Sequence, residues 1–249
     1  FLKYPNSPII YSITEPSKKK NIIGSLEEFQ SYCIEVFNFY DKRKTEEFIQ
    51  ETKETVKNFL QTNGNKYVFF DFNIEKSEVE NEKKEEEKPL ERVIFELFNN
   101  QCPITSKNFL SICKGEKNMK GEKLTYENTI IHRVSPNSFI QGGDIQPKEG
   151  GRSIYGNQFN DEHYDVLHNT PGILGMVKKG MSPHTNECQF YITLAPLICF
   201  DKKFVAFGRV IQGYETIKKI GLVKTDLQRP VDRVTIIKCG EYTVDSIKL

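Results

Sequence analysis

The sequence predicts a mainly β protein, a barrel or a sandwich, with a mostly helical extension at its N-terminal end. From Tyr67 onward, short apolar runs alternate with Gly, Pro and Asn turns, a pattern typical of closed or stacked antiparallel sheets. Before Lys66, apolar residues instead recur at helical spacing within two polar segments. We therefore expect an extension over residues 1–66 and a β domain over residues 67–249, with no internal repeat.

Composition narrows the classes of protein that the chain can belong to. Of its 249 residues, 37% are hydrophobic and 28% are charged, and the net charge of +1 does not suggest nucleic acid or an anionic membrane as a partner. No stretch approaches the 18 apolar residues of a membrane span. The six cysteines form no C-x-x-C pair, and we expect no metal site. Reduced thiols fit an intracellular location, most simply the cytoplasm. Because the chain starts with Phe1, we expect a fragment or a processed form.

The extension should contain one strand and two amphipathic helices. "SPIIYSIT" is typical of a strand. The first helix should begin at Ser25, which forms a capping box with Glu28, and the second should end at Asn63 and Gly64. A small α/β fragment and a helical arm both remain open. The predicted apolar faces are Leu26, Phe29, Cys33, Val36 and Phe37 in the first helix, and Phe48, Ile49, Val56, Phe59 and Leu60 in the second.

The β domain should begin with the strands "YVFFDFNIE" and "RVIFELF". The charged insert at residues 75–91 enlarges their connection, either as a solvated or disordered loop or as a docking tail. "CPITSKNFLSICKG" predicts a helix entered at Pro103 and ended by Gly115. "QGYETIKKIGLV" predicts one more helix. The remaining strands are expected in "TIIHRV", "SFIQGGDI", "GILGMV", "QFYITL", "VAFGRVI" and "VTIIKCG".

Five segments in order resemble the signature segments of cyclophilins, which are peptidyl-prolyl cis-trans isomerases. They are "IIHRVSPNSFIQGGDI", "GGRSIYGNQFNDEHY", "HNTPGILGMV", "NECQFYIT" and "FVAFGRVIQGYE". The resemblance runs from Tyr67 to about Tyr242. It implies an eight-stranded antiparallel barrel capped by two helices, which begin near Thr105 and Tyr214.

The residue types suit this reaction. Rotating an X-Pro bond crosses a barrier of roughly 20 kcal/mol but makes and breaks no heavy-atom bond, so it needs no nucleophile, metal or cofactor. In the twisted state the proline nitrogen regains a lone pair, which a fixed cationic donor stabilises. Arginine fits because its charge is permanent.

The resemblance implies specific roles for residues of this chain. Arg133 matches the catalytic arginine, and Gln141 matches the glutamine that holds it. The partner would be a proline-containing peptide or protein. Substrate-binding positions are His132, Ser138, Phe139, Asn186, Gln189, Tyr191, Cys199, Phe200 and Phe204; of these, Asn186 and Gln189 would meet the substrate backbone, and Phe139, Tyr191, Phe200 and Phe204 would line the proline pocket.

Several of these residues also have simpler interpretations. Arg133 could pair with a surface acid, and Gln141 could be an ordinary barrel-lining side chain. Gly142 and Gly143 fit a strand bend better than a phosphate loop, since no strand-to-helix context follows. His168 lacks the partners of a metal site.

The chain departs from the family pattern around the proline pocket. Ser138 and Phe139 stand where the family usually has Phe and Met, and Cys199 stands where it has Trp. Phe200 replaces Leu, and Phe204 replaces His. Losing a pocket wall could cost on the order of 1–3 kcal/mol, so we expect weak isomerase activity and weak cyclosporin binding.

A second departure lies beside the pocket. Val177, Lys178 and Lys179 stand where the family usually has Ala-Asn-Ala. The two lysines either favour acidic residues of a substrate or are simply solvated.

The whole pattern is similar to divergent isomerase-like proteins with an N-terminal extension. "NIIGSLEEFQSYC" is similar to the end of a thioredoxin-like unit. Two hypotheses follow: a weak isomerase, which we favour, or a binding or structural module in a larger assembly such as the ciliary axoneme. Residues 1–66 would then contact an assembly partner, and the cilium would be one location of the protein.

Overall fold

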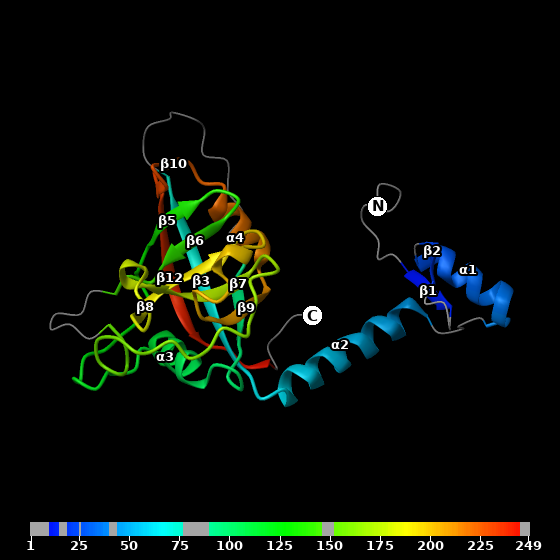
Figure 1. Ribbon diagram of the computed structural model, residues 1–249, viewed down its shortest axis with the longest axis horizontal. Coiled ribbons are helices and arrows are strands. Elements are labelled where there is room, and N and C mark those ends of the chain that lie inside the picture. Colours follow the sequence, from blue (N-terminus) through cyan, green and yellow to red (C-terminus); the bar gives the residue numbers. More distant parts are fainter. Residues whose placement is uncertain are drawn as a thin grey trace. The chain divides into compact units, whose positions relative to one another are not determined.

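The computed structural model describes residues 10–14, 19–24, 26–39, 44–76, 90–145 and 152–244 (Figure 1). It divides the chain into two compact units, residues 1–55 and 56–249. This division lies inside helix α2 (Thr45–Thr62), upstream of the predicted one at residue 66. None of the described helices is long and apolar enough to cross a membrane.

The first unit contains a strand pair and a helix. Strands β1 (Ile10–Thr14) and β2 (Lys19–Gly24) are antiparallel, and helix α1 (Leu26–Phe37) follows. Strand β1 agrees with the prediction from "SPIIYSIT", whereas β2 was not predicted. The expected cap at Ser25 lies outside the described residues. The apolar face predicted for α1 is not fully covered, since Phe37 is 66% exposed.

The second unit is an eight-stranded antiparallel barrel. Its strands follow the order β12-β3-β4-β9-β7-β8-β6-β5. A bridge between Ile130 and Thr235 connects the two outer strands, with hydrogen bonds from Asn128 N to Ile236 O (2.7 Å) and from Ile236 N to Thr129 O (2.9 Å). The predicted barrel is therefore confirmed. The strands are β3 (Lys66–Glu75), β4 (Val93–Leu97), β5 (Ile131–Ser135), β6 (Phe139–Gly142), β7 (Ile173–Lys178), β8 (Asn186–Thr193), β9 (Ala206–Gln212) and β12 (Arg233–Glu241).

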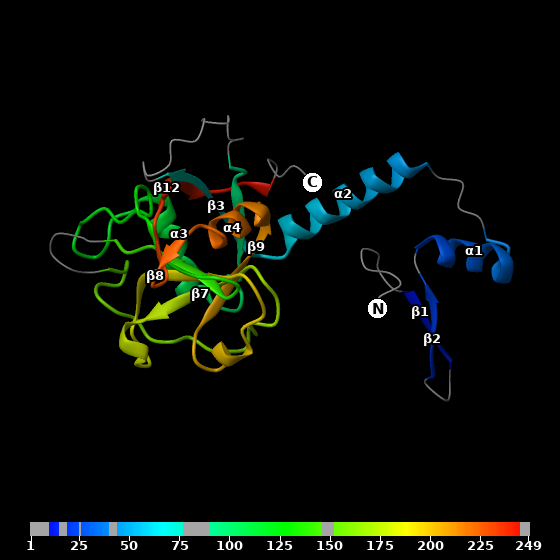
Figure 2. The same cartoon turned by 90° about the horizontal axis from the view of Figure 1, so that it is seen from above.

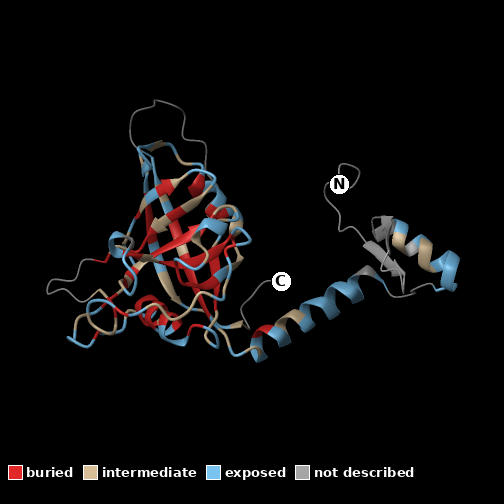
Figure 3. Cartoon of the chain, viewed as in Figure 1, coloured by how far each residue is buried: buried red, intermediate tan, exposed pale blue. Residues whose placement is uncertain are grey.

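Aromatic rings fill the inside of the barrel. Phe70 lies 5.1 to 5.9 Å, centroid to centroid, from five other rings, which suits edge and tilted aromatic contacts. The hydroxyl of Tyr126 donates to the carbonyl of Cys188 at 2.7 Å, which satisfies a polar group at the centre of the core. Buried residues accordingly concentrate in the strands and in the helix below them (Figure 3).

Two helices cover the barrel, as the resemblance implies. Helix α3 (Pro103–Lys114) starts at the expected proline and ends at Gly115, whose φ of 70° is left-handed. Helix α4 (Tyr214–Gly221) is the second. They lie toward opposite ends of the barrel in Figure 1 and project onto the same region when seen from above in Figure 2.

Short elements complete the unit. The 3₁₀ turns are η1 (Lys179–Met181) and η2 (Ile198–Phe200). Strands β10 (Thr225–Asp226) and β11 (Arg229–Pro230) form a small hairpin. Most of the charged insert, residues 77–89, lies outside the described residues.

The end of α2 is fastened to the barrel through a buried carboxylate. Glu96, only 1% exposed, accepts hydrogen bonds from Asn63 Nδ2 and Asn65 Nδ2, both at 2.9 Å, and from Arg209 Nε at 2.8 Å. Tyr67 donates its hydroxyl to the carbonyl of Leu60 at 2.9 Å. The last turn of α2 therefore folds with the barrel, which explains why the two units divide inside this helix.

Candidate functional site

The candidate site lies on three neighbouring strands. A tight turn joins β5 to β6, with Ser138 N bonded to Ser135 O at 3.0 Å. The register places Arg133 opposite Gln141, and Gln141 opposite Tyr191 of β8. Residues distant in the sequence are therefore neighbours across the sheet.

Arg133 projects from β5 and is exposed. Its Nε donates to Gln228 Oε1 at 2.7 Å, and its guanidinium carbon lies 5.0 Å from the centre of the Phe139 ring. Within the described part of the chain, no carboxylate forms an ion pair with it, so the pairing with a surface acid is not seen there. Gln228 was missed by sequence analysis, because it lies 95 positions away in an unremarked turn.

Gln141 has a different set of partners from the one expected. Its Nε2 lies 3.0 Å from Gln189 Oε1 and 3.2 Å from His132 Nε2. Gln189 in turn donates to Asp144 at 3.0 Å, which also pairs with Arg152 at 3.1 Å. In the structure Arg133 Nε donates to Gln228, and the expectation that Gln141 holds Arg133 stays a prediction. Burial lowers the pKa of His132, so this histidine stays neutral beside Gln141.

The four aromatic residues expected to line the proline pocket contact one another. The ring centroids of Phe139 and Phe200 are 5.6 Å apart, those of Tyr191 and Phe200 5.3 Å, and those of Phe200 and Phe204 4.7 Å. These distances are those of ordinary packed rings, so the four residues form one aromatic cluster beside Arg133.

The aromatic cluster comprises Phe139, Tyr191, Phe200 and Phe204. Two positions at which the family usually has aromatic residues contribute no ring to it. Ser138 is half-buried and contributes no ring, and Cys199 is an exposed residue of η2. Phe139, next to Ser138, turns toward Phe200 and Tyr191 instead. The cluster therefore consists of its own four rings, and the side chains of Ser138 and Cys199 add no aromatic wall to it.

A buried hydrogen-bond chain fixes the floor of the cluster. His168 is 0% exposed; its Nδ1 lies 2.8 Å from Asp201 Oδ1 and its Nε2 lies 2.6 Å from the Tyr191 hydroxyl. Because Asp201 accepts from Nδ1, Tyr191 donates to Nε2 of a neutral imidazole. A Cβ added at Gly175 would lie 2.2 Å from that hydroxyl, so a glycine is needed beneath the ring.

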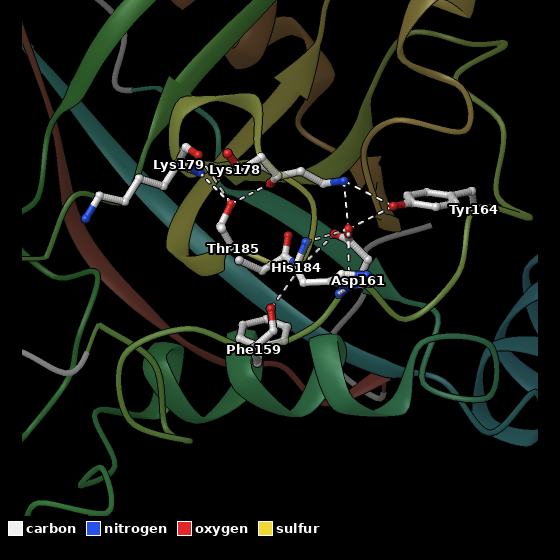
Figure 4. Close-up of polar contacts among 9 residues, drawn as sticks. Phe159, Asp161, Tyr164, Lys178, Lys179, His184 and Thr185 are labelled. Atoms are coloured by element: carbon white, nitrogen blue, oxygen red, sulfur yellow. Dashed lines mark hydrogen bonds and ion pairs between the residues drawn. The ribbon is translucent and has the colours of Figure 1, made fainter.

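Lys178 and Asp161 belong to a polar network with Tyr164 and His184 (Figure 4). Asn186 is 0% exposed and donates to Asp161 Oδ1 at 2.9 Å, while its expected contact with a substrate backbone stays a prediction. Lys178 donates to Asp161 Oδ2 at 2.9 Å, with the two side chains 4% and 2% exposed. Burial raises the pKa of Asp161, but hydrogen bonds from Lys178, His184 N and Asn186 outweigh it and lower the pKa. Only Lys179 of the two lysines remains exposed.

His163 lies close to the buried thiol of Cys102. Its Nε2 lies 3.8 Å from Cys102 Sγ, but burial raises the pKa of that thiol to about 12, so it stays protonated. Among the described residues, no group of three or more His, Cys, Asp or Glu side chains could hold a metal ion.

Comparison with known proteins agrees with this fold. The family described as "Cyclophilin type peptidyl-prolyl cis-trans isomerase/CLD" matches residues 83–241. The fold and site define a cyclophilin-type domain, and the chain belongs to this family.

Three relatives illustrate the range of proteins that carry such a domain. "Probable inactive peptidyl-prolyl cis-trans isomerase-like 6" of Homo sapiens is 38% identical over 223 residues, which cover 88% of this chain and 68% of that protein. "NK-tumor recognition protein" of Homo sapiens is 43% identical over 166 residues, 64% of this chain and 11% of that protein. "E3 SUMO-protein ligase RanBP2" of Homo sapiens is 43% identical over 155 residues, 61% of this chain and 5% of that protein.

Proposed function

We propose that this chain is a peptidyl-prolyl isomerase of weak activity that acts on proline-containing peptides or proteins. The observation that carries the proposal is the pairing of an exposed, unneutralised Arg133 with an aromatic cluster whose rings contact one another. The cation supplies what the reaction needs, whereas the cluster limits how well a proline ring is held.

The expected rate follows from these two features. A fixed guanidinium stabilises the twisted amide more than the planar one, so the chemical step needs no nucleophile, metal or cofactor. Binding a proline ring, however, relies on this cluster without an aromatic ring from Ser138 or an indole from Cys199. If this costs about 1–3 kcal/mol of apolar contact, activity falls by roughly ten- to a hundredfold.

A binding or structural module is the second candidate function. Two relatives that match over 88% of this chain carry "probable inactive" in their names, and two others contain the matching segment as a small part of a much larger protein. An aromatic surface beside a cation would bind a proline-rich partner without isomerising its X-Pro bonds. Residues 1–66, including the thioredoxin-like segment, would contact the rest of an assembly, and the proposed location is cytoplasmic, with the cilium as one setting.

Exchange NMR on a proline-containing peptide distinguishes the two functions. We expect slow but measurable cis-trans exchange with the wild-type chain, which Arg133→Ala abolishes. Phe200→Leu should raise the rate about tenfold, because it introduces the leucine that the family usually has at this position. Phe98→Leu serves as a matched control, since it makes the same change beside Arg209, outside the cluster.

Equal exchange rates for the wild type, Arg133→Ala and Phe200→Leu would rule out catalysis by this site. Peptide binding, followed by chemical shift changes in the same samples, would then support the binding module. We also expect weak cyclosporin binding, since Cys199 offers no indole at the usual Trp position, and Cys199→Trp should raise the affinity.

A further inference from the structure

The geometry points to Gln228 as the positioning residue for Arg133, in the place that the family resemblance gives to Gln141. This inference rests on the proposed function of Arg133. Gln228 contacts two consecutive residues of β5: its side-chain oxygen accepts from Arg133 Nε at 2.7 Å, and its carbonyl accepts from Val134 N at 2.8 Å. One residue therefore fixes both the backbone of the strand and the direction of its exposed side chain.

The hairpin that carries Gln228 has an unusual turn. Asp226 pairs with Arg229, which leaves Leu227 and Gln228 as a two-residue loop with φ values of 46° and 69°. Such a loop favours Asn and Gly, because both positions are left-handed. Leu227 is 96% exposed, so burial of its side chain does not offset the strain. Backbone strain of this kind is retained where the surrounding contacts require it, and the contacts made here are those of Gln228.

An amide is well suited to this position. A glutamine oxygen accepts from Nε while leaving the charge of the guanidinium intact, and the terminal nitrogens stay directed away from the contact. The Phe139 ring, 5.0 Å from the guanidinium carbon, limits movement on its own side. Gln141 instead directs its Nε2 at Gln189 and His132.

The NMR signal of the Arg133 Nε–H group tests the contact directly in the full chain. We expect Gln228→Ala to increase the solvent-exchange rate of this proton about fivefold, as expected for the loss of one hydrogen bond. Gln141→Ala should leave the rate unchanged. Leu227→Gly, which relaxes the turn but keeps Gln228, controls for loosening of the hairpin and should also leave it unchanged.

Turnover supplies the second readout. At saturating peptide, Gln228→Ala should lower kcat at least fivefold with KM nearly unchanged, because the cation is misplaced while the aromatic cluster is intact. Gln228→Glu should restore protection of the Nε proton but not kcat, since a carboxylate neutralises the guanidinium.

The two readouts separate the inference from the function on which it rests. If Gln228→Ala leaves the Nε proton protected, or if Gln141→Ala exposes it, Gln228 is not the positioning residue. If the proton responds as expected but the wild type shows no more exchange of the peptide than Arg133→Ala, the contact stands, while the isomerase function and with it the positioning role are rejected.

Discussion

At the scale of single residues, one hydroxyl group and one missing side chain decide how the aromatic cluster is built. The hydroxyl of Tyr191 reaches His168 only because Gly175 has no Cβ beneath it. The ring is therefore held from below by a hydrogen bond and from the side by Phe200, 5.3 Å away. A phenylalanine at position 191 would keep the ring but lose its tether.

Gly175→Ala tests this arrangement. The added Cβ would force the ring of Tyr191 upward, and we expect a loss of about 1–3 kcal/mol in the free energy of unfolding. Combining it with Tyr191→Phe should cost less than the sum of the two single changes, because an untethered ring can move. Urea denaturation measures all three variants, and strictly additive values would contradict the contact.

His168 gives the protein a predictable response to acid. Burial lowers its pKa, against the opposing effect of Asp201, so the folded state stays neutral while the unfolded state takes up a proton near pH 6.5. Stability should therefore be complete above pH 6.5 and decline as the pH falls from there toward the folded pKa. His132 acts in the same direction, since burial also lowers its pKa.

Thermal melts between pH 7.5 and 5.0 measure this effect. We expect the Tm of the wild type to fall across this range, and that of His168→Gln to fall less steeply because only His132 still contributes. Parallel slopes for the two proteins would show that His168 is not held neutral by the fold.

At the scale of elements, ion pairs connect strands to loops. Lys178 at the end of β7 pairs with Asp161 of a preceding loop, and His184 N donates to the same carboxylate at 2.9 Å. The loops on either side of β7 are thus fixed by one carboxylate that is only 2% exposed. The lysine therefore has a structural role and is not free to attract an acidic substrate.

Lys178→Met should be strongly destabilising. It leaves the buried Asp161 carboxylate without its cation, and we expect a loss of about 3–5 kcal/mol in unfolding free energy. Adding Asp161→Asn should recover part of that loss, because no buried charge remains. Lys179→Met is the matched control, since its side chain is exposed, and an equal effect of the two lysine changes would contradict the buried pair.

Sequence patterns predicted most elements but not all of their contacts. Strong periodicity and end signals, such as Pro103 and Gly115, predicted α3 correctly. Strand β2 has a charged start and no alternation, and the turn at Leu227 and Gln228 lacks the usual Asn-Gly signal, so neither was predicted. The aromatic residues of the site were predicted to line a pocket, but whether rings enclose a space or touch depends on their orientation. The hydrogen-bond partners of Gln141 and Asn186 could not be predicted either, because an amide side chain does not reveal its partner.

At the scale of the whole molecule, the end of α2 belongs energetically to the barrel. Asn63 and Asn65 supply two of the hydrogen bonds to the buried Glu96, and Leu60 is 7% exposed. A cut that removes residues 1–55 retains these contacts. A cut at the predicted domain boundary removes them all.

Two truncated chains test this difference. We expect the chain that begins at Lys66 to be about 2–4 kcal/mol less stable than the one that begins at Val56, since it leaves a buried carboxylate short of donors and loses a buried leucine. Asn63→Ala in the longer chain should reproduce part of that loss. Equal urea midpoints for the two truncated chains would show that α2 does not stabilise the barrel.

The closure of the barrel between β5 and β12 has a consequence for motion. Strand β5 pairs along its length with β6, but on its other side the single bridge at Ile130 and the contact of Val134 with the hairpin connect it. Fewer hydrogen bonds must break for it to swing outward than for any central strand to do so, and amide protons here should exchange with solvent sooner than those of β3 or β8. Each such opening would carry the Arg133 guanidinium away from the aromatic cluster, so the opening rate of β5 would set an upper limit on how long the proposed catalytic arrangement persists.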